Sequence, residues 1–282
     1  MPAADVRTAV TTAVAAGRMG DRLWLYATYH CNLRCSYCLT ESSPRISDRR
    51  EMAGEDMLVA VKQAAPLGFA SVGVTGGEVF MLPWIGDVLV EIAGVLPTTV
   101  LTNGTLLPDR LLRRIEPLAG NRDFALQLSL DSADPAGNDR LRGPGNFARV
   151  CESVPRLRES GIAVRIATTV EHQTGDDLAR LCELHRSWGI GDDDHIVRPV
   201  VRRGRAATRG MGVVPQPDDI LPELTITSEG AFLDPFAPTV RHGATDLDRL
   251  VCRQTAPLTA AAGAFLAAVA DRPGADVERN IR

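Results

Sequence analysis

Residues 30–38 read "HCNLRCSYC", and this stretch places Cys31, Cys35 and Cys38 within eight residues of one another. The 282-residue chain has six cysteines, so half of them lie here. The N-terminus has no basic segment followed by an apolar core, which predicts no secretory signal and a cytoplasmic location. Clustered cysteines in a reducing compartment more often bind metal or carry out redox chemistry than form disulfides. The stretch therefore predicts a thiol-based site.

The composition is that of an ordinary soluble globular protein, with 45% hydrophobic and 23% charged residues. The formal net charge of −4 implies no general attraction to nucleic acid or to an anionic membrane. No apolar run reaches membrane-spanning length. One locally basic run is interpreted as a solvated loop, with contact to an anionic group as the alternative: Arg198, Arg202, Arg203, Arg205 and Arg209.

Short runs rich in Val, Ile, Leu or Thr alternate with helical patterns along most of the chain. Strands are expected at 23–28, 71–76, 98–104, 124–131, 163–170 and 195–200, and helices at 54–66, 84–95, 108–119, 145–160 and 175–188. This order predicts an α/β fold with a parallel sheet and right-handed crossovers. Six strands are too few for the usual eight-stranded barrel, so a partial, TIM-like (β/α)6 barrel fits better. Its site should lie at the carboxyl ends of the strands.

The alternation does not extend over the whole chain, which predicts three parts. Residues 1–21 form an Ala-rich N-terminal helical segment, and residues 22–205 form the barrel core. Residues 206–282 form a small C-terminal appendage that begins with a Gly- and Pro-rich linker. A hairpin at 224–235 and a terminal helix at 255–270 are expected within this appendage.

Three thiolates on one loop fit an iron–sulfur cluster better than a zinc ion. A structural zinc site normally has four protein ligands. A [4Fe–4S] cluster with three cysteine ligands keeps one iron free to bind another molecule. His30 is a conceivable fourth ligand, but on a strand its side chain points away from that of Cys31. The open iron is therefore the preferred interpretation.

The C-x3-C-x2-C spacing after the first strand, with Tyr37 before the third cysteine, resembles the radical S-adenosylmethionine (SAM) superfamily. The resemblance covers about residues 22–200 and implies one [4Fe–4S] cluster held by Cys31, Cys35 and Cys38. It also implies that Tyr37 lies at the cofactor. The segment Gly76–Gly77–Glu78 follows the second strand, where the superfamily binds the amino group of SAM.

The resemblance implies further cofactor- or substrate-binding side chains at the following strand ends: Asn103, Ser129, Asp131, Arg142 and Arg198. Arg198 is a candidate partner of the SAM carboxylate, whereas Arg142 could instead be a solvated loop cation. On the fifth strand Arg165 and Thr168 face opposite sides, and the sequence does not decide which one faces inward.

Members of this superfamily use the reduced cluster to cleave SAM into a 5′-deoxyadenosyl radical, which removes a hydrogen atom from an unactivated C–H bond. The cofactor supplies the difficult chemistry, and the protein orients the substrate and excludes water. The resemblance implies an electron donor such as flavodoxin or ferredoxin. The expected substrate is a polar small molecule. Acidic residues could meet a polycationic amino sugar, with solvated loops as the alternative: Asp134, Asp139, Asp192, Asp193, Asp194, Asp218, Asp219 and Glu223.

The remaining cysteines bear on the reaction outcome. Cys151 and Cys182 follow helical apolar stripes and are expected to be small core residues, so a single cluster is predicted. Cys252 is the lone cysteine of the appendage. It is either a buried filler or a hydrogen-atom donor that inverts a carbon centre. Size, a single cluster motif and this cysteine resemble the small radical SAM epimerases of the neomycin C epimerase type, which act on aminoglycosides in antibiotic biosynthesis.

Epimerisation with Cys252 as donor is therefore the preferred reaction, and three alternatives remain. One is a radical SAM dehydratase or dehydrogenase of a sugar or aminocyclitol, and the second is a peptide-modifying enzyme. The third is a non-catalytic iron–sulfur binding or regulatory protein. The intact Gly-Gly-Glu segment argues against the third, because a mere cluster carrier has no use for a SAM amine site.

Overall fold

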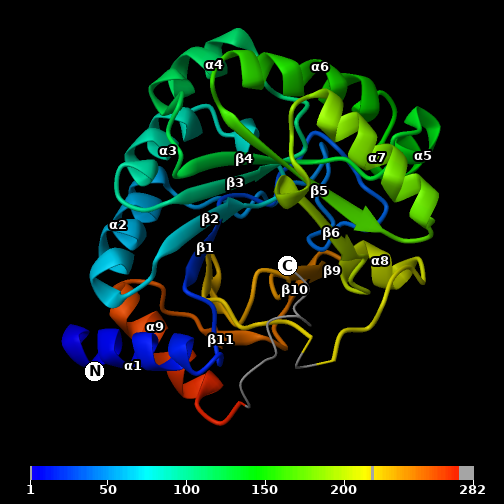
Figure 1. The fold of residues 1–282 in the computed structure, drawn as a ribbon. Coiled ribbons are helices and arrows are strands. Elements are labelled where there is room, and N and C mark those ends of the chain that lie inside the picture. Colours follow the sequence, from blue (N-terminus) through cyan, green and yellow to red (C-terminus); the bar gives the residue numbers. More distant parts are fainter. Residues whose placement is uncertain (1, 217–218, 273–282) are drawn as a thin grey trace.

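The computed structural model describes residues 2–216 and 219–272, and its centre is a parallel sheet of six strands in sequence order. These strands are β1 (Arg22–Tyr26), β2 (Ser71–Thr75), β3 (Thr98–Thr102), β4 (Phe124–Ser129), β5 (Ala163–Val170) and β6 (His195–Pro199). The sheet curves into an open barrel with helices on its convex face (Figure 1). The predicted α/β partial barrel is confirmed.

The helices between the strands also follow the expected order. They are α2 (Gly54–Ala64), α3 (Ile85–Ala93), α4 (Asp109–Ile115), α5 (Pro135–Arg142), α6 (Asn146–Glu159) and α7 (Gly175–Ser187). Short 3-10 turns are η1 (Ala65–Leu67), η2 (Val79–Met81), η3 (Glu116–Leu118) and η4 (Asp192–Asp194). The sequence did not predict α5. Asp134 caps its N-terminus by accepting a hydrogen bond from Gly137 N, and Pro135 occupies its first position.

The two faces of the sheet differ in chemistry because side chains alternate along each strand. On β4, Phe124, Leu126 and Leu128 are buried in the main hydrophobic core beneath the helices. Gln127 and Ser129 face the other way, into a cavity. The inner face of this barrel is therefore polar and partly hollow, which is what a binding site requires.

The C-terminal segment continues the same sheet. Its elements are α8 (Gly204–Thr208), β7 (Thr225–Thr227), β8 (Gly230–Phe232), β9 (Thr239–Arg241), β10 (Ala244–Asp246), β11 (Leu250–Cys252) and α9 (Leu258–Val269). Strand β7 pairs in parallel with β1, and the predicted hairpin is β7–β8. Strand β11 pairs with β8, whereas β9 and β10 form a separate two-stranded sheet. The sheet thus crosses the expected boundary at residues 205 and 206.

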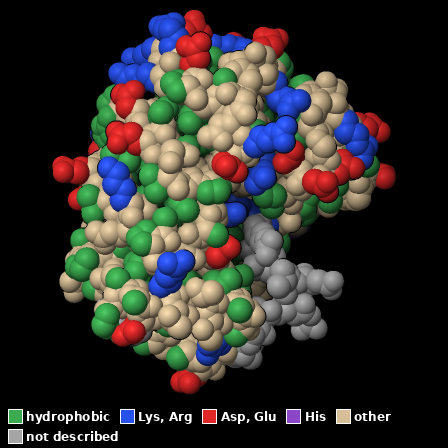
Figure 2. All heavy atoms as spheres, turned by 60° about the vertical axis from the view of Figure 1, so that its left-hand side comes forward, with side chains coloured by type: hydrophobic (Ala, Val, Ile, Leu, Met, Phe, Trp, Pro, Cys, Tyr) green, Lys and Arg blue, Asp and Glu red, His purple; other side chains and the backbone are tan. Residues whose placement is uncertain are grey.

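Both ends of the described chain meet on one side of the molecule. Helix α1 (Ala3–Ala15) lies beside α9 (Figure 1). Residues 273–282 of the predicted appendage lie outside the described part of the chain. Among the described residues no helix is both long and apolar enough to cross a membrane. On the face shown in Figure 2, the described acidic and basic side chains are interspersed, without one continuous patch of either charge.

Candidate active site

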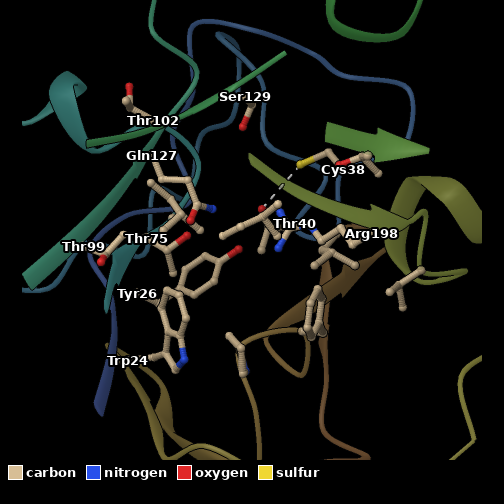
Figure 3. Close-up of a pocket in the computed structure, with 18 of the residues that line it drawn as sticks. Trp24, Tyr26, Cys38, Thr40, Thr75, Thr99, Thr102, Gln127, Ser129 and Arg198 are labelled. Carbon is tan, nitrogen blue, oxygen red and sulfur yellow. Dashed lines mark hydrogen bonds between the residues drawn. The ribbon is translucent and has the colours of Figure 1, made fainter. Parts of the chain in front are cut away.

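A cavity of about 530 Å³ occupies the concave face of the sheet. One end is formed by the loop of residues 30–42 that follows β1, here called the cysteine loop. The other end is formed by Gly20, Asp21 and Arg22, which precede β1. The cavity therefore runs along the full length of the strands. Figure 3 shows part of its lining, with side chains from both the barrel core and the C-terminal segment.

The Gly-Gly pair after β2 supports the start of the cysteine loop. Gly77 N donates to the Thr28 carbonyl oxygen at 2.7 Å, and Glu78 N donates to the His30 carbonyl oxygen at 2.9 Å. A Cβ atom at Gly76 would lie 2.4 Å from the Thr28 oxygen, and one at Gly77 would lie 2.3 Å from the His30 oxygen. Both contacts are with backbone, which cannot move aside easily. Only glycine allows this close approach, and both glycines also line the cavity.

The carboxylate of Glu78 is used within the protein. It is fully buried and accepts hydrogen bonds from Thr102 Oγ1 at 2.8 Å, Asn103 N at 2.7 Å and Phe80 N at 3.1 Å. Burial raises its pKa, and these hydrogen bonds act in the opposite direction. Glu78 does not line the cavity. It joins the ends of β2 and β3.

All three clustered cysteines line the cavity. Cys31 Sγ accepts from Leu33 N at 3.3 Å, Cys35 Sγ lies 3.7 Å from the Arg142 carbonyl oxygen, and Cys38 Sγ lies 3.6 Å from Thr40 Oγ1. Burial raises the pKa of the Cys31 thiol, and it raises the pKa of Cys35 to about 11. Both thiols are therefore protonated near neutral pH until a metal displaces the protons.

The cysteine site does not have the geometry of a single-ion site. Among the residues that the structure describes, no group of three or more His, Cys, Asp or Glu side chains is placed to hold one metal ion. A [4Fe–4S] cluster makes a different demand, because each cysteine ligand binds a separate iron atom. Three thiols spaced around a cavity fit that demand.

Asp131 organises the wall next to Cys35. Its carboxylate accepts from Tyr37 Oη at 2.5 Å, from Arg142 Nε at 2.8 Å and from Thr169 N at 2.9 Å. It is fully buried and does not itself line the cavity, whereas Tyr37 and Arg142 do. The Asp131 charge raises the pKa of Arg142 against the opposing effect of burial. Arg142 is thus a buried, ion-paired group, and the alternative of a solvated loop cation is wrong.

Arg198, Asn103 and Ser129 are brought to the cavity as expected. The Arg198 guanidinium lies over the ring of Phe236, 5.5 Å from its centroid, and burial lowers its pKa. Arg198 forms no ion pair with any residue in the described part of the chain, and it lines the cavity. Arg198 is partly buried, and a partly buried cation without a carboxylate partner is a suitable place for an anionic group of a ligand. Asn103 Nδ2 donates to Asn32 Oδ1 at 2.9 Å and lies 3.7 Å from Cys31 Sγ.

Sequence reasoning missed the role of Arg205. Its backbone N donates to the Cys38 carbonyl oxygen at 2.9 Å, and its guanidinium donates to the carbonyl oxygens of Cys35 and Ser42. Arg205 is only 6% exposed, so the interpretation of the basic run as a solvated loop is wrong for this residue. The preceding Gly204 has φ +53°, and a Cβ atom there would lie 2.1 Å from the Leu39 carbonyl oxygen. No pattern in the sequence distinguishes Arg205 from its arginine neighbours.

Several residues singled out in the sequence lie away from the cavity. Cys252 does not line it, and its Sγ donates to the Gln254 carbonyl oxygen at 3.2 Å. Cys151 and Cys182 are partly exposed and lie outside the core, so the prediction of core positions is wrong. His30 is buried but does not line the cavity.

Among the other candidate side chains, some line the cavity and others do not. On β5, Arg165 faces the cavity, whereas the Thr168 hydroxyl donates to the Leu130 carbonyl oxygen on the opposite side. Of the acidic residues considered for an amino sugar, Asp193 and Glu223 line the cavity. Asp218 lies outside the described residues.

Comparison with known proteins adds a family and several relatives. The family model described as the radical SAM superfamily matches residues 25–185. The protein is 32% identical over 168 residues to the antilisterial bacteriocin subtilosin biosynthesis protein AlbA of Bacillus subtilis, which covers 57% of this chain and 36% of AlbA. It is 35% identical over 184 residues to GTP 3′,8-cyclase of Microcystis aeruginosa, which covers 60% of this chain and 54% of the cyclase. The chain therefore spans between a third and about half of these relatives.

A solved structure gives the same fold. Streptococcus suis SuiB bound to S-adenosylmethionine superposes with a TM-score of 0.57 and 23% sequence identity. The match covers 69% of this chain and 44% of SuiB. At this identity the similarity concerns the fold alone.

Proposed function

Because the chain belongs to the radical SAM superfamily, we propose that its cavity is the active site and that Cys31, Cys35 and Cys38 hold the cluster. As a superfamily member the protein is a radical SAM enzyme that uses one [4Fe–4S] cluster and SAM. The observation that carries the assignment of the site is that all three cysteines line one cavity, which is also lined by Arg198, an arginine without an ion-pair partner among the described residues.

The residues around the cavity fit these cofactors. Three thiols on one loop supply three cluster ligands and no fourth. The raised pKa values of Cys31 and Cys35 mean that cluster assembly has to release protons from these two thiols, as for other thiolate sites. The backbone of Gly76 and Gly77 and the side chain of Asn103 form the neighbouring wall. When bound, the cluster and SAM together supply a 5′-deoxyadenosyl radical that abstracts a hydrogen atom from the substrate.

The role of the protein side chains is to bind and orient SAM and the substrate and to exclude water. Arg198 is the best candidate to pair with the carboxylate of SAM, because its charge has no partner within the described protein. Ser129 and Tyr37 line the same part of the cavity and can hydrogen-bond the nucleoside. Asp131 acts indirectly, by fixing Tyr37 and Arg142. A flavodoxin or ferredoxin is the proposed electron donor.

The assignment is tested by replacing one of the three cysteines. Cys35→Ala should lose most bound iron and sulfide after anaerobic reconstitution, and it should form no 5′-deoxyadenosine from SAM and dithionite. Cys182→Ala is the matched control, because this thiol lies outside the cavity. A Cys35→Ala protein with a full cluster and normal SAM cleavage would disprove the site.

Epimerisation with Cys252 as hydrogen-atom donor is a candidate for the outcome of the reaction. It is compatible with a protonated Cys252 thiol, whose pKa is raised by burial, although an ordinary thiol is also protonated at neutral pH. Its position outside the cavity counts against a direct transfer. AlbA is named for bacteriocin biosynthesis and the cyclase for GTP, and neither name is that of an epimerase. Peptide modification, dehydration or dehydrogenation of a sugar or aminocyclitol remain the competing outcomes.

These outcomes differ in their products. An epimerase working in D2O places one deuterium on the inverted carbon, because a thiol exchanges with solvent. A dehydrogenase yields a carbonyl product instead. Retention of epimer formation by Cys252→Ala would remove Cys252 from the mechanism.

A further inference from the structure

The side chain of Tyr26, on β1, lines the cavity beside the cysteine loop. We infer that Tyr26 is the hydrogen-atom donor of this cavity, whose phenolic hydrogen quenches a carbon radical formed there. The inference rests on the proposed function, because that function supplies the radical. It goes further by assigning a donor to the interior of the barrel, which Cys252, outside the cavity, does not reach.

The first observation is the place of the Tyr26 hydroxyl. The residue is only 5% exposed and lines the cavity. In Figure 3 the hydroxyl end of its ring points toward Thr40 and Arg198. The same neighbours act on the pKa of the phenol: burial and the charge of Cys38 raise this pKa, whereas Thr40 and Arg198 lower it. The hydroxyl therefore lies near a proposed cluster ligand and near the proposed partner of the SAM carboxylate, at the end of the cavity where the radical is generated.

The second observation is that the other thiols and aromatic N–H or O–H groups of the cavity are already in use. The three thiols of the cysteine loop lose their hydrogens when they bind the cluster. The Tyr37 hydroxyl donates to Asp131 Oδ2 at 2.5 Å, and the Trp24 indole donates to Glu223 Oε2 at 2.6 Å. Among the residues that the structure describes, Tyr26 is therefore the one phenol or thiol of the cavity that is neither a proposed ligand nor bound to a carboxylate.

The chemistry of a phenol suits the transfer. A phenolic O–H bond is weaker than an alkyl C–H bond, because the unpaired electron left behind spreads over the ring. In the transfer the Tyr26 O–H bond breaks, a C–H bond forms on the radical carbon, and a phenoxyl radical remains on Tyr26. One electron from a donor of the flavodoxin or ferredoxin class and one proton from solvent restore the phenol. When the product is an epimer, each turnover thus uses two electrons, one for SAM and one for Tyr26.

Tyr29 packs against Tyr26 but differs from it in access. The two ring centroids are 5.2 Å apart at an interplanar angle of 85°, which is an edge-to-face contact. Tyr29 is fully buried and does not line the cavity. A phenol that has no access to the cavity cannot quench a radical formed in it. Tyr29 is therefore a matched control of the same chemical type.

The test uses the holoenzyme, with its cluster and SAM bound, and needs no identified substrate. In D2O, with titanium(III) citrate as reductant, the Tyr26 phenol exchanges its hydrogen for deuterium and should quench the radical formed from SAM. Mass spectrometry should then find one solvent-derived deuterium in most of the 5′-deoxyadenosine. Tyr26→Phe should lose most of this deuterium, because the radical then has to take non-exchangeable hydrogen. Tyr29→Phe should keep it.

Electron paramagnetic resonance gives a second readout that does not depend on the product. Wild-type samples frozen during the reaction should contain a tyrosyl radical, and its spectrum should narrow when ring-deuterated tyrosine is incorporated. The signal should persist in Tyr29→Phe and disappear in Tyr26→Phe. Iron content and SAM affinity should be equal in wild type and Tyr26→Phe, whereas a merely structural role of Tyr26 would lower them.

Three results would each overturn the inference. They are the absence of a tyrosyl signal in the wild type, undiminished deuterium in Tyr26→Phe, and an equal loss of deuterium in Tyr29→Phe. The wild-type signal does not depend on how well Tyr26→Phe folds. Formation of 5′-deoxyadenosine in the same wild-type samples would leave the proposed function standing, whereas its absence would contradict the proposed function itself.

Discussion

Two thiol-bearing regions lie at the ends of strands of the same sheet, and they are built in opposite ways. The cysteine loop after β1 places three thiols in a cavity, and contacts from β2 and α8 support it. The end of β11 has one thiol, Cys252, outside the cavity, and among the described residues its one hydrogen-bond partner is the nearby Gln254 carbonyl oxygen. Burial raises the pKa of Cys31 and Cys35 on the cysteine loop, and it also raises the pKa of Cys252. Burial alone therefore does not distinguish a ligand cysteine from a cysteine that only fills space. The hydrogen bonds that hold the surrounding backbone in place do distinguish them.

The support comes from segments far apart in the sequence. Gly77 N and Glu78 N bond to the start of the cysteine loop, and Arg205 bonds to its middle. Val240 N on β9 donates to the Leu39 carbonyl oxygen at 3.0 Å. Three separate segments thus order one loop of irregular backbone. Such preorganisation is what a metal site with few ligands requires.

The largest effect is expected at the ligands themselves. Cys31→Ala, Cys35→Ala and Cys38→Ala should each abolish SAM cleavage, whereas Cys252→Ala should leave SAM cleavage in the absence of substrate at the wild-type rate. The physical reason is that only the first three thiols reach the cavity. Iron content and the yield of 5′-deoxyadenosine measure this difference. Equal losses of iron and of 5′-deoxyadenosine yield in Cys35→Ala and Cys252→Ala would contradict the difference between the two regions.

The next effect is expected at the glycine that supports the loop. Gly77→Ala places a Cβ atom 2.3 Å from the His30 carbonyl oxygen and has to displace backbone. We expect a loss of stability of up to about 3 kcal/mol and a strongly reduced cluster content. Chemical denaturation and iron analysis measure the two effects.

Gly175→Ala is the control for that substitution, because a Cβ atom at Gly175 meets nothing within 4 Å. Gly175→Ala should change neither the stability nor the cluster content. Full cluster content in Gly77→Ala would mean that the cysteine loop does not depend on the Gly-Gly turn.

A smaller effect is expected from Arg205. Arg205→Met removes the hydrogen bonds to the Cys35 and Ser42 carbonyl oxygens and one positive charge beside the cluster site. Cluster content should fall without disappearing, and hydrogen exchange of residues 35–42 should accelerate. The reduction potential of the remaining cluster should become more negative, because a nearby cation favours the reduced, more negative state.

Arg209→Met is the matched control for Arg205→Met, since Arg209 is exposed at the end of α8. Its cluster content and potential should equal those of the wild type. An unchanged potential in Arg205→Met, with normal exchange in the loop, would contradict a positioning role for Arg205.

The sequence predicted the barrel better than it predicted the roles of individual polar residues. Strand positions follow from local alternation of apolar residues, and β1 to β6 lie within a few residues of their expected ranges. Glu78 and Asp131 were expected at the site, and each carboxylate accepts three hydrogen bonds from partners inside the protein. Those partners come from neighbouring strands, so their identity depends on the register of the sheet.

The role of Arg205 and the position of Cys252 also depend on contacts between residues that lie far apart in the sequence. Arg205 meets the cysteine loop across about 170 residues of chain. The place of Cys252 depends on the pairing of β11 with β8 and of β8 with β7. A local pattern cannot specify such contacts, whereas the C-x3-C-x2-C spacing is complete within eight residues.

The smallest effect on stability is expected for Cys252→Ala. The same variant tests how far the two thiol-bearing regions differ in function. The side chain is partly exposed and packs only against the edge of the core, so Cys252→Ala should change the free energy of unfolding by no more than about 1 kcal/mol. Cluster content and uncoupled SAM cleavage should be unchanged. If the product in D2O then lacks deuterium while 5′-deoxyadenosine still forms, the thiol of β11 acts on the substrate although it lies outside the cavity in this conformation. If the deuterated product persists, the donor is another exchangeable group, and Cys252 takes no part in the reaction.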